Sequence, residues 1–340
     1  MINIPSRFSS ILSTLLITAL ILIASPIQHA NAATGPLCYV RVGASGAGDS
    51  WSDAYPDLQS ALADNNCTEI WVAQGTYYPD EGTGQTNDNR SSTYTLKSGV
   101  AIYGGFDGTE PLRTDRDWEN NTTTLSGDID QTAGDSGNAY HVIVGSSTDS
   151  TAILDGFTIT AGNADAPVIY PADPNSSGGG IYSYNGNASL RNLIFYTNKA
   201  VQGGGGLYAG AEYGVTGYSP TLDNVIFNMN TSETFGAGIY VSFVNTPGLI
   251  KNTTFKNNTS DYEGGGMFNI ASDPTLENVT FSNNTAAGGT GVSYLDHRGG
   301  AIFNDLGSKP TITNATFSGN SAASKGGAIY IPITVTNFRF

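Results

Sequence analysis

The chain has 340 residues with 29 acidic against 14 basic side chains, a formal charge of −15 at pH 7, and only 13% of its residues are charged. This acidic balance argues against nucleic acid and anionic lipid as partners, and it permits calcium without requiring it. Together with 43 glycines, the composition is typical of an extracellular β protein.

The first 32 residues predict a signal peptide. Arg7 precedes an apolar run from Ile11 to Ala24, and Ala30-Asn31-Ala32 supplies the small residues that a signal peptidase reads. The run is too short and wrongly flanked for a stable membrane span, and no later stretch reaches that length. We therefore expect a mature chain from about Ala33, carrying 13 basic and 29 acidic residues, that is secreted or displayed at the cell surface or outer membrane.

Residues 33–75 predict an N-terminal cap. Tyr39–Val42 and Ile70–Ala73 are expected to be strands, with Ser50 or Ser52 as the N-cap of a helix between them. Such a helix would cover the open apolar end of the first coil of a solenoid. Its apolar positions recur three and four residues apart at Trp51, Ala54, Leu58, Ala61 and Leu62.

The two cysteines, Cys38 and Cys67, both lie in this cap. An even count in an exported chain favours one disulfide over two free thiols. No further ligands accompany the cysteines, so the sequence predicts no metal centre.

Residues 76–163 predict irregular early coils, with a polar loop over 80–92 and a charged segment over 107–121. Leu154–Ile159 is interpreted as a degenerate first copy of the repeat that follows, because Gly156 and Gly162 stand where later copies have Asn. We expect the ladder of Asn side chains to be absent or offset in this copy.

Residues 164–340 predict regular coils. A Gly-small-small-apolar-aromatic motif recurs six times, at 178–182, 204–208, 236–240, 264–268, 299–303 and 326–330. The glycines suit a bend that needs positive φ or has no room for a Cβ atom, after which the next residues start a strand. Repetition at a period of a few tens of residues indicates a solenoid.

A second motif alternates with the first and carries Phe with Asn three residues before and after it. The apolar residues five before the Phe, the residues two before it and the Phe itself are expected to face inward, while Asn at the bends can adopt the left-handed conformation and stack its amides. The copies are Asn192/Phe195/Asn198, Asn224/Phe227/Asn230, Asn252/Phe255/Asn258, Asn278/Phe281/Asn284 and Asn314/Phe317/Asn320. This pattern predicts an all-β fold, a parallel β-helix with the N-terminal helix as its cap.

Side chains four residues before each Phe alternate in charge: Arg191, Asp223, Lys251, Glu277, then Thr313. On stacked coils, opposite charges would be vertical neighbours, so we interpret this row as structural support rather than as a ligand site. Two segments, 209–220 and 286–298, are insertions on one face, where repeat proteins often place their binding surface.

The two motifs resemble the repeats of the polymorphic outer membrane proteins of chlamydiae and of related secreted bacterial proteins with a pectin-lyase-like, right-handed β-helix. The resemblance implies that fold and a surface or secreted setting, with scaffold and adhesion elements rather than catalytic residues. Because that family normally continues into further coils, we expect either that the sequence ending at Phe340 is truncated or that its last strand caps the stack poorly.

Candidate sites for chemistry are few. Asp128 and Asp130 alternate about Ile129, which would put two carboxylates on one strand face about 7 Å apart, while His141 is expected to be a structural histidine. No converging acid, base and metal set is found, so catalytic residues and cofactors are not predicted, with Asp128, Asp130 and His297 as weak candidates and calcium as the one open option.

We therefore predict a non-catalytic, adhesin-like or structural interaction module whose partner is a surface glycan or protein of a host or the environment. The alternative is a polysaccharide-active lyase or hydrolase, or a carbohydrate-binding β-helix. Ligand contact is expected on the two insertions, at Tyr213, Tyr218, Tyr294, Asp296 and His297.

Overall fold

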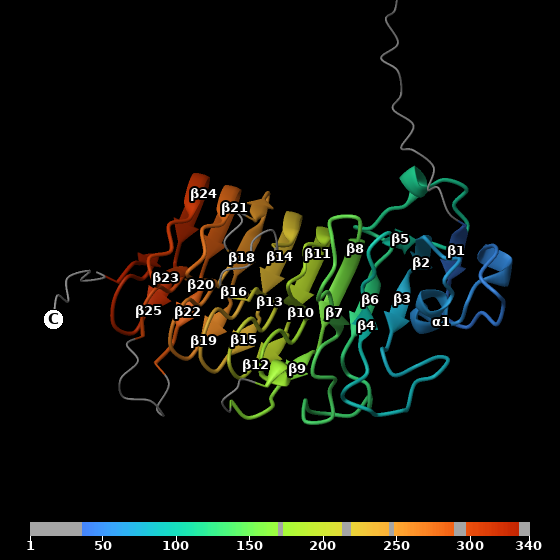
Figure 1. The fold of residues 1–340 in the computed structure, drawn as a ribbon, viewed down its shortest axis with the longest axis horizontal. Coiled ribbons are helices and arrows are strands. Elements are labelled where there is room, and N and C mark those ends of the chain that lie inside the picture. The colour runs from blue at the N-terminus through green and yellow to red at the C-terminus, as the bar shows by residue number, and fades with distance from the viewer. Residues whose placement is uncertain (1–35, 169–172, 213–218, 245–247, 289–296, 333–340) are drawn as a thin grey trace, which may run out of the picture. The chain divides into compact units, whose positions relative to one another are not determined.

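The computed structural model describes residues 36–168, 173–212, 219–244, 248–288 and 297–332. The chain divides into two units, Met1–Ala32 and Ala33–Phe340, and the predicted signal peptide lies outside the described residues. The second unit is a parallel β-helix, whose coils follow one another in the order of the sequence (Figure 1). None of the helices in the described ranges is long and apolar enough to cross a membrane.

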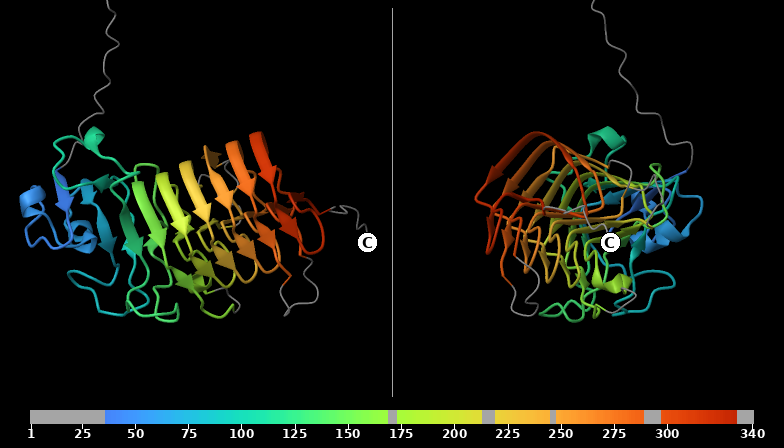
Figure 2. Two further views of the ribbon diagram at one scale, coloured as in Figure 1. Left: turned by 180° about the vertical axis from the view of Figure 1, so that it is seen from behind. Right: turned by 60° about the vertical axis from the view of Figure 1, so that its left-hand side comes forward.

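Three parallel sheets run along the stack of coils, and Figure 2 shows their strands lying side by side from behind and in an oblique view. The twelve-stranded sheet contains β1 (Leu37–Val40), β2 (Glu69–Ala73), β3 (Gly75–Tyr77), β5 (Ala101–Phe106), β6 (Thr123–Ser126), β8 (Ile153–Thr160), β11 (Ser189–Tyr196), β14 (Thr221–Asn228), β17 (Leu249–Lys251), β18 (Thr254–Lys256), β21 (Thr275–Ser282) and β24 (Thr311–Ser318). The eight-stranded sheet contains β4 (Tyr94–Thr95), β7 (Ile143–Val144), β10 (Ile181–Tyr184), β13 (Leu207–Gly210), β16 (Ile239–Ser242), β20 (Met267–Ile270), β23 (Ile302–Asp305) and β26 (Ile329–Tyr330). The six-stranded sheet contains β9 (Asn163–Ala164), β12 (Lys199–Ala200), β15 (Thr231–Ser232), β19 (Thr259–Ser260), β22 (Thr285–Ala286) and β25 (Ser321–Ala322).

The phenylalanines of the repeat form one column in the core. Phe195 pairs in register with Phe227, and their rings stack with centroids 4.6 Å apart. The column continues through Phe255 and Phe281 at 5.0 and 4.4 Å, and all four side chains are fully buried. Phe317 extends it at 5.2 Å from Phe281, with a ring that is only partly buried. These residues face inward, as the motif predicts.

Two bends in each coil follow from residues that tolerate positive φ. The first glycine of each triplet is left-handed, with φ from 50° at Gly236 to 72° at Gly178. The first Asn of each Phe motif is also left-handed, with φ from 50° to 57°. These residues are Asn192, Asn224, Asn252, Asn278 and Asn314.

The second Asn of each Phe motif differs from the prediction, because it does not adopt the left-handed conformation in any copy. This correction applies to Asn198, Asn230, Asn258, Asn284 and Asn320. The left-handed residue is instead the one that precedes it, namely Thr197, Met229, Asn257, Asn283 and Gly319. The bend is therefore made one residue earlier than expected, and the second Asn is left to place its amide in the core.

The amides of the second Asn stack in a ladder that reaches the last described coils. Asn258 Nδ2 donates to Asn284 Oδ1 at 2.9 Å, and Asn284 Nδ2 donates to Asn320 Oδ1 at the same distance. Asn320 Nδ2 donates in turn to the Phe281 carbonyl at 2.9 Å. Asn284 is fully buried, whereas Asn320 is only partly buried. The predicted stacking of amides thus holds, although positive φ at these positions was wrong.

The degenerate first copy has the predicted register, since Leu154 pairs with Leu190 and Ile159 with Phe195. Its ladder is offset as expected. Gly156 offers no amide, so Asn192 Nδ2 donates to the Asp155 carboxylate at 2.7 Å instead.

The cap differs from the prediction in its helix. Trp51–Asp53 is a separate 3₁₀ turn, η1, and α1 spans only Leu58–Ala63. Asp57 caps α1 by accepting from Ser60 N, whereas Ser50 precedes η1 without a capping bond. Pro56 explains the break, because the residue before a proline avoids the helical region. The apolar side of α1 nevertheless packs into the core, as predicted for a cap.

Two smaller 3₁₀ turns complete the elements, η2 at Arg113–Asp115 and η3 at Pro174–Ser176. The predicted disulfide joins Cys38 to Cys67. On the outer face of the twelve-stranded sheet, Asp223 pairs in register with Lys251, and their charged groups lie 3.0 Å apart. The alternating row of charges is thus a column of vertical neighbours.

Candidate binding groove

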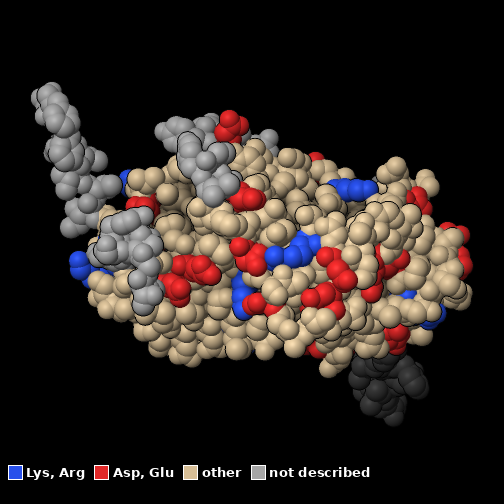
Figure 3. All heavy atoms as spheres, turned by 90° about the horizontal axis from the view of Figure 1, so that it is seen from below, with Lys and Arg blue, Asp and Glu red and all other residues tan. Residues whose placement is uncertain are grey.

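A groove of about 470 Å³ runs over the outer side of the six-stranded sheet. These strands lie along the lower edge of the molecule in Figure 1, and Figure 3, seen from below, shows acidic side chains gathered over that face with basic groups among them. The groove is lined by Asp135, Asn163, Asp165, Lys199, Ala200, Val201, Thr231, Ser232, Glu233, Thr259 and Asp261.

The strand period explains which side chains reach the groove. In β12, β15, β19 and β22 the second residue is buried, as at Ala200 and Ser232, so the first faces outward. The parallel register places Asn163 beside Lys199 and Thr231 beside Thr259. An amide, an ammonium and two hydroxyl groups therefore stand in one row across successive coils.

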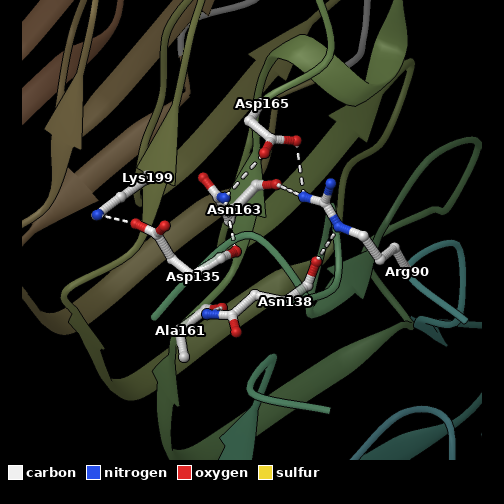
Figure 4. Close-up of polar contacts among 7 residues, drawn as sticks. All are labelled: Arg90, Asp135, Asn138, Ala161, Asn163, Asp165 and Lys199. Carbon is white, nitrogen blue, oxygen red and sulfur yellow. Dashed lines mark hydrogen bonds and ion pairs between the residues drawn. The ribbon is translucent and has the colours of Figure 1, made fainter. Parts of the chain in front are cut away.

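A fixed polar network closes the N-terminal end of the groove (Figure 4). Arg90 donates to the Asp165 carboxylate at 2.7 Å, to the Asn163 carbonyl at 3.1 Å and to the Asn138 carbonyl at 2.6 Å. Asn163 Nδ2 in turn donates to the Asp135 carbonyl at 2.8 Å and to Asp165 Oδ2 at 3.1 Å. These hydrogen bonds connect the loops that carry Arg90 and Asp135 to β9, although the loops are far apart in the sequence.

The Lys199 ammonium forms an ion pair with the Asp135 carboxylate in the same network. This hydrogen bond lowers the pKa of the Asp135 carboxyl. Both acids at this end are therefore neutralised by the protein's own basic groups, Lys199 for Asp135 and Arg90 for Asp165.

The other end of the groove holds two carboxylates without such partners. Glu233 and Asp261 directly follow β15 and β19, and their backbone nitrogens continue the parallel hydrogen bonds to Ala200 and Ser232. They are thus vertical neighbours of like charge, and no residue that the structure describes pairs with either carboxylate. Like charges at such positions destabilise a sheet, in contrast to the Asp223–Lys251 pair on the other face.

His297 lies next to this end. Its Nδ1 atom is 3.1 Å from the Asp261 carbonyl, which can only accept, so Nδ1 carries the proton and Nε2 faces no partner within the described ranges. The His297 ring stacks on Tyr262 at 5.3 Å. Burial raises the pKa of the Asp261 carboxyl, and the nearby His297 opposes that rise.

Other predicted residues are placed differently. Asp128 and Asp130 do not share a strand face, because β6 ends at Ser126 and both acids lie in the turn that follows. Burial and then the Asp130 charge raise the pKa of Asp128. His141 is buried, with Nδ1 2.9 Å from the Gly178 carbonyl, as expected of a structural histidine. Tyr213, Tyr218, Tyr294 and Asp296 lie outside the described residues.

One group of potential metal ligands converges within 4.8 Å in the part of the chain that is described: Cys38, Asp64 and Cys67. Its two sulfur atoms are bonded to each other, so they offer no thiolate to a metal. No cofactor is indicated by this group.

Sequence reasoning missed Glu233, Asp261 and the row from Asn163 to Thr259. The strands that carry them are two residues long, too short for a period to be detected. A signal was nevertheless present: aligning the Phe motifs puts Glu233 six residues after Phe227 and Asp261 six after Phe255, which predicts two stacked acids.

The Chlamydia polymorphic membrane protein repeat matches residues 278–305 and 314–332 of the chain. The chain is also similar to the probable autotransporter YfaL of Escherichia coli strain K12, with 32% identity over 127 residues that cover 33% of this chain and 10% of the relative. The chain thus spans about a tenth of the length of that relative. No solved structure matches it.

Fold and groove together define a β-solenoid with a polar face that runs across successive coils. The chain is a β-helix protein with repeats of the polymorphic membrane protein type. These similarities point to a protein of the cell surface or one associated with the outer membrane.

Proposed function

We propose that this chain is a non-catalytic, adhesin-like interaction module that holds a surface glycan in the groove over the six-stranded sheet. The observation that carries the proposal is the pair of unpartnered, stacked carboxylates, Glu233 and Asp261, in a groove that also presents hydroxyl groups. No cofactor takes part in this function. The surface location implied by the similarities supports it.

The chemistry of the groove selects the kind of glycan. Thr231 and Thr259 offer hydroxyl groups one coil apart, which suits a ligand rich in hydroxyl groups. Glu233 and Asp261 favour positive charge, because a cation between them would relieve their repulsion. A polymer of amino sugars has both properties, whereas an acidic polysaccharide would be repelled.

The solenoid is suited to this task because its core is independent of its surface. Inward positions such as Phe227 are held by ring stacking and full burial, while Thr231 of β15 and Thr259 of β19 face outward and are only partly buried. The groove is therefore rigid before binding, and little ordering entropy opposes the ligand.

A blocking substitution tests the proposal. Residues 33–340 are applied to an array of neutral, acidic and amino-sugar glycans, together with the variants Thr259→Arg and Thr280→Arg. Thr259 lines the groove, whereas Thr280 occupies the outer face of β21, so the second variant controls for the added charge and bulk.

We expect amino-sugar glycans to be retained by the parent chain and by Thr280→Arg, with at least about a tenfold loss for Thr259→Arg. Equal retention by both variants would place the site elsewhere. Release of new reducing ends from any bound glycan would show that the chain is an enzyme instead.

A further inference from the structure

Three buried oxygens under the loop 80–92 lack hydrogen-bond partners among the residues described: Asp80 Oδ1, Ser92 Oγ and Tyr94 Oη. Asp80 is 4% exposed and Tyr94 1% exposed. A carboxylate oxygen only accepts, so Asp80 Oδ1 requires a donor or a cation. Buried polar atoms in native proteins are otherwise almost always satisfied, so this group calls for an explanation.

Hydrogen bonds hold these residues in one place. Gln59 Nε2 donates to the carbonyls of both Pro79, at 2.6 Å, and Thr93, at 3.0 Å. Asp80 follows Pro79 in the chain and Ser92 precedes Thr93. The two ends of the loop 80–92 therefore meet at the side-chain amide of Gln59. Asp80 Oδ2 also accepts from Asp88 N at 2.9 Å, which folds the loop back over the pair.

Two more carboxylates belong to the same neighbourhood. Asp57, the cap of α1, is 8% exposed, and Gly82 lies so close that a Cβ atom there would overlap Asp57 Oδ1. Glu81 stands between Asp80 and Gly82 in the chain. Partial desolvation raises the pKa of the Glu81 carboxyl, although the residue as a whole is exposed, and the charges of Asp80 and Asp57 raise it further.

No basic side chain balances these acids. The six ion pairs among the described residues involve other carboxylates, and burial and then the charges of Glu81, Asp57 and Asp80 raise the pKa of the neighbouring Tyr94. Buried charges in proteins are paired or coordinate a metal. A water molecule would satisfy Asp80 Oδ1 as a donor, yet it would leave the negative charge uncompensated.

We propose that Asp57, Asp80 and Ser92, joined by Glu81 from the surface, bind a calcium ion beneath the loop 80–92. Carboxylate and hydroxyl oxygens are ligands for calcium rather than for softer metals such as zinc. The three acids do not converge within 4.8 Å, and the Glu81 side chain is exposed and has no partner within the described ranges. When calcium binds, the Glu81 side chain therefore moves inward to reach the ion, and the ion links the loop 80–92 to Asp57 in the cap.

Thermal unfolding of residues 33–340 in calcium and in EDTA tests the site. We expect calcium to raise the melting temperature by about 2 °C or more, with about one ion bound in calorimetry. Asp80→Asn should abolish the rise and, in EDTA, should melt at or above the parent chain because an unpaired buried charge is gone. If Asp80 had only a structural role, Asp80→Asn would change the melting temperature in the same direction in calcium and in EDTA.

Asp49→Asn is the matched control, because Asp49 is an exposed acid elsewhere in the cap and should keep the full calcium response. Ser92→Ala retains the charges and should weaken calcium affinity severalfold, which keeps the proposal testable if Asp80→Asn fails to fold. Equal melting temperatures of the parent chain in calcium and EDTA would overturn the proposal. So would an undiminished response in Asp80→Asn.

Discussion

Asn230 Oδ1 accepts two hydrogen bonds from Asn198, one from its backbone nitrogen and one from its Nδ2 atom, both at 3.1 Å. Asn230 makes the same pair of bonds to Asn258 at 3.0 Å, and its Nδ2 also donates to the Phe195 carbonyl at 3.0 Å. Each buried amide is thus saturated by the coils on either side. The ladder therefore fixes the vertical register of the solenoid.

Asn258→Asp should destabilise the fold by about 3 kcal/mol, because a carboxylate cannot donate to the Phe227 carbonyl and its charge would be buried. Urea denaturation measures the loss. Asn257→Asp is the control, since Asn257 is exposed and Asp tolerates its left-handed backbone. Similar losses in both variants would show that the ladder does not set the stability.

Phe255→Ala should cost about 3 to 5 kcal/mol, because Phe255 is fully buried between two stacked rings and leaves a cavity. Phe317→Ala removes the same atoms from the last described coil, where the ring is only partly buried, and should cost less. The two denaturation midpoints give the comparison. A cost at Phe317 equal to that at Phe255 would contradict a core centred on the inner coils.

Replacing both Cys38 and Cys67 by Ser should lower stability by about 3 kcal/mol, since the bond closes a loop with a sequence separation of 29 residues. Thermal melts with and without reductant measure the effect. Reductant should lower the melting temperature of the parent chain and leave the double variant unchanged. If the parent chain, after unfolding and refolding, had the same melting temperature with and without reductant, the result would argue against the disulfide.

Asp128→Asn should raise the melting temperature at about pH 7 and leave it unchanged at about pH 3. Burial and the Asp130 charge raise the pKa of Asp128 in the folded chain, so the folded state binds its proton more tightly than the unfolded state. Stability is therefore lost as the pH rises from the unfolded pKa through the folded one.

Asp149→Asn gives the opposite sign. Hydrogen bonds from Thr151 lower the pKa of the Asp149 carboxyl, so its contribution is present above the unfolded pKa and lost as the pH falls through the folded one. This variant should melt lower than the parent chain near neutral pH. The same sign in both variants would refute the electrostatic assignment.

Much of the core could be predicted from sequence because its signals are local. Phe195 and Asn198 lie three residues apart and this pair recurs in five coils, so the two columns follow once the chain is known to stack. The exact bend was harder to predict, since the left-handed residue is Thr197 rather than Asn198, and Asn283 rather than Asn284. Both choices fit the same motif, and only the backbone distinguishes them.

The groove could not be assembled in the same way. Arg90 and Asp165 are 75 residues apart, and their contact depends on loops whose course has no repeat. The helix of the cap was overextended for a related reason, because the apolar spacing from Trp51 to Leu62 outweighed the single break at Pro56. Periodicity predicts which residues face inward and does not place the loops between them.

The most direct test of the groove compares an oligomer of glucosamine, which carries ammonium groups, with its fully N-acetylated counterpart, using calorimetry at low and high salt. We predict at least about tenfold tighter binding of the charged oligomer, weakened by salt and lost in the Glu233→Gln/Asp261→Asn double variant. Equal affinity for the two oligomers, or a preference that survives the double variant, would contradict a ligand site at Glu233 and Asp261.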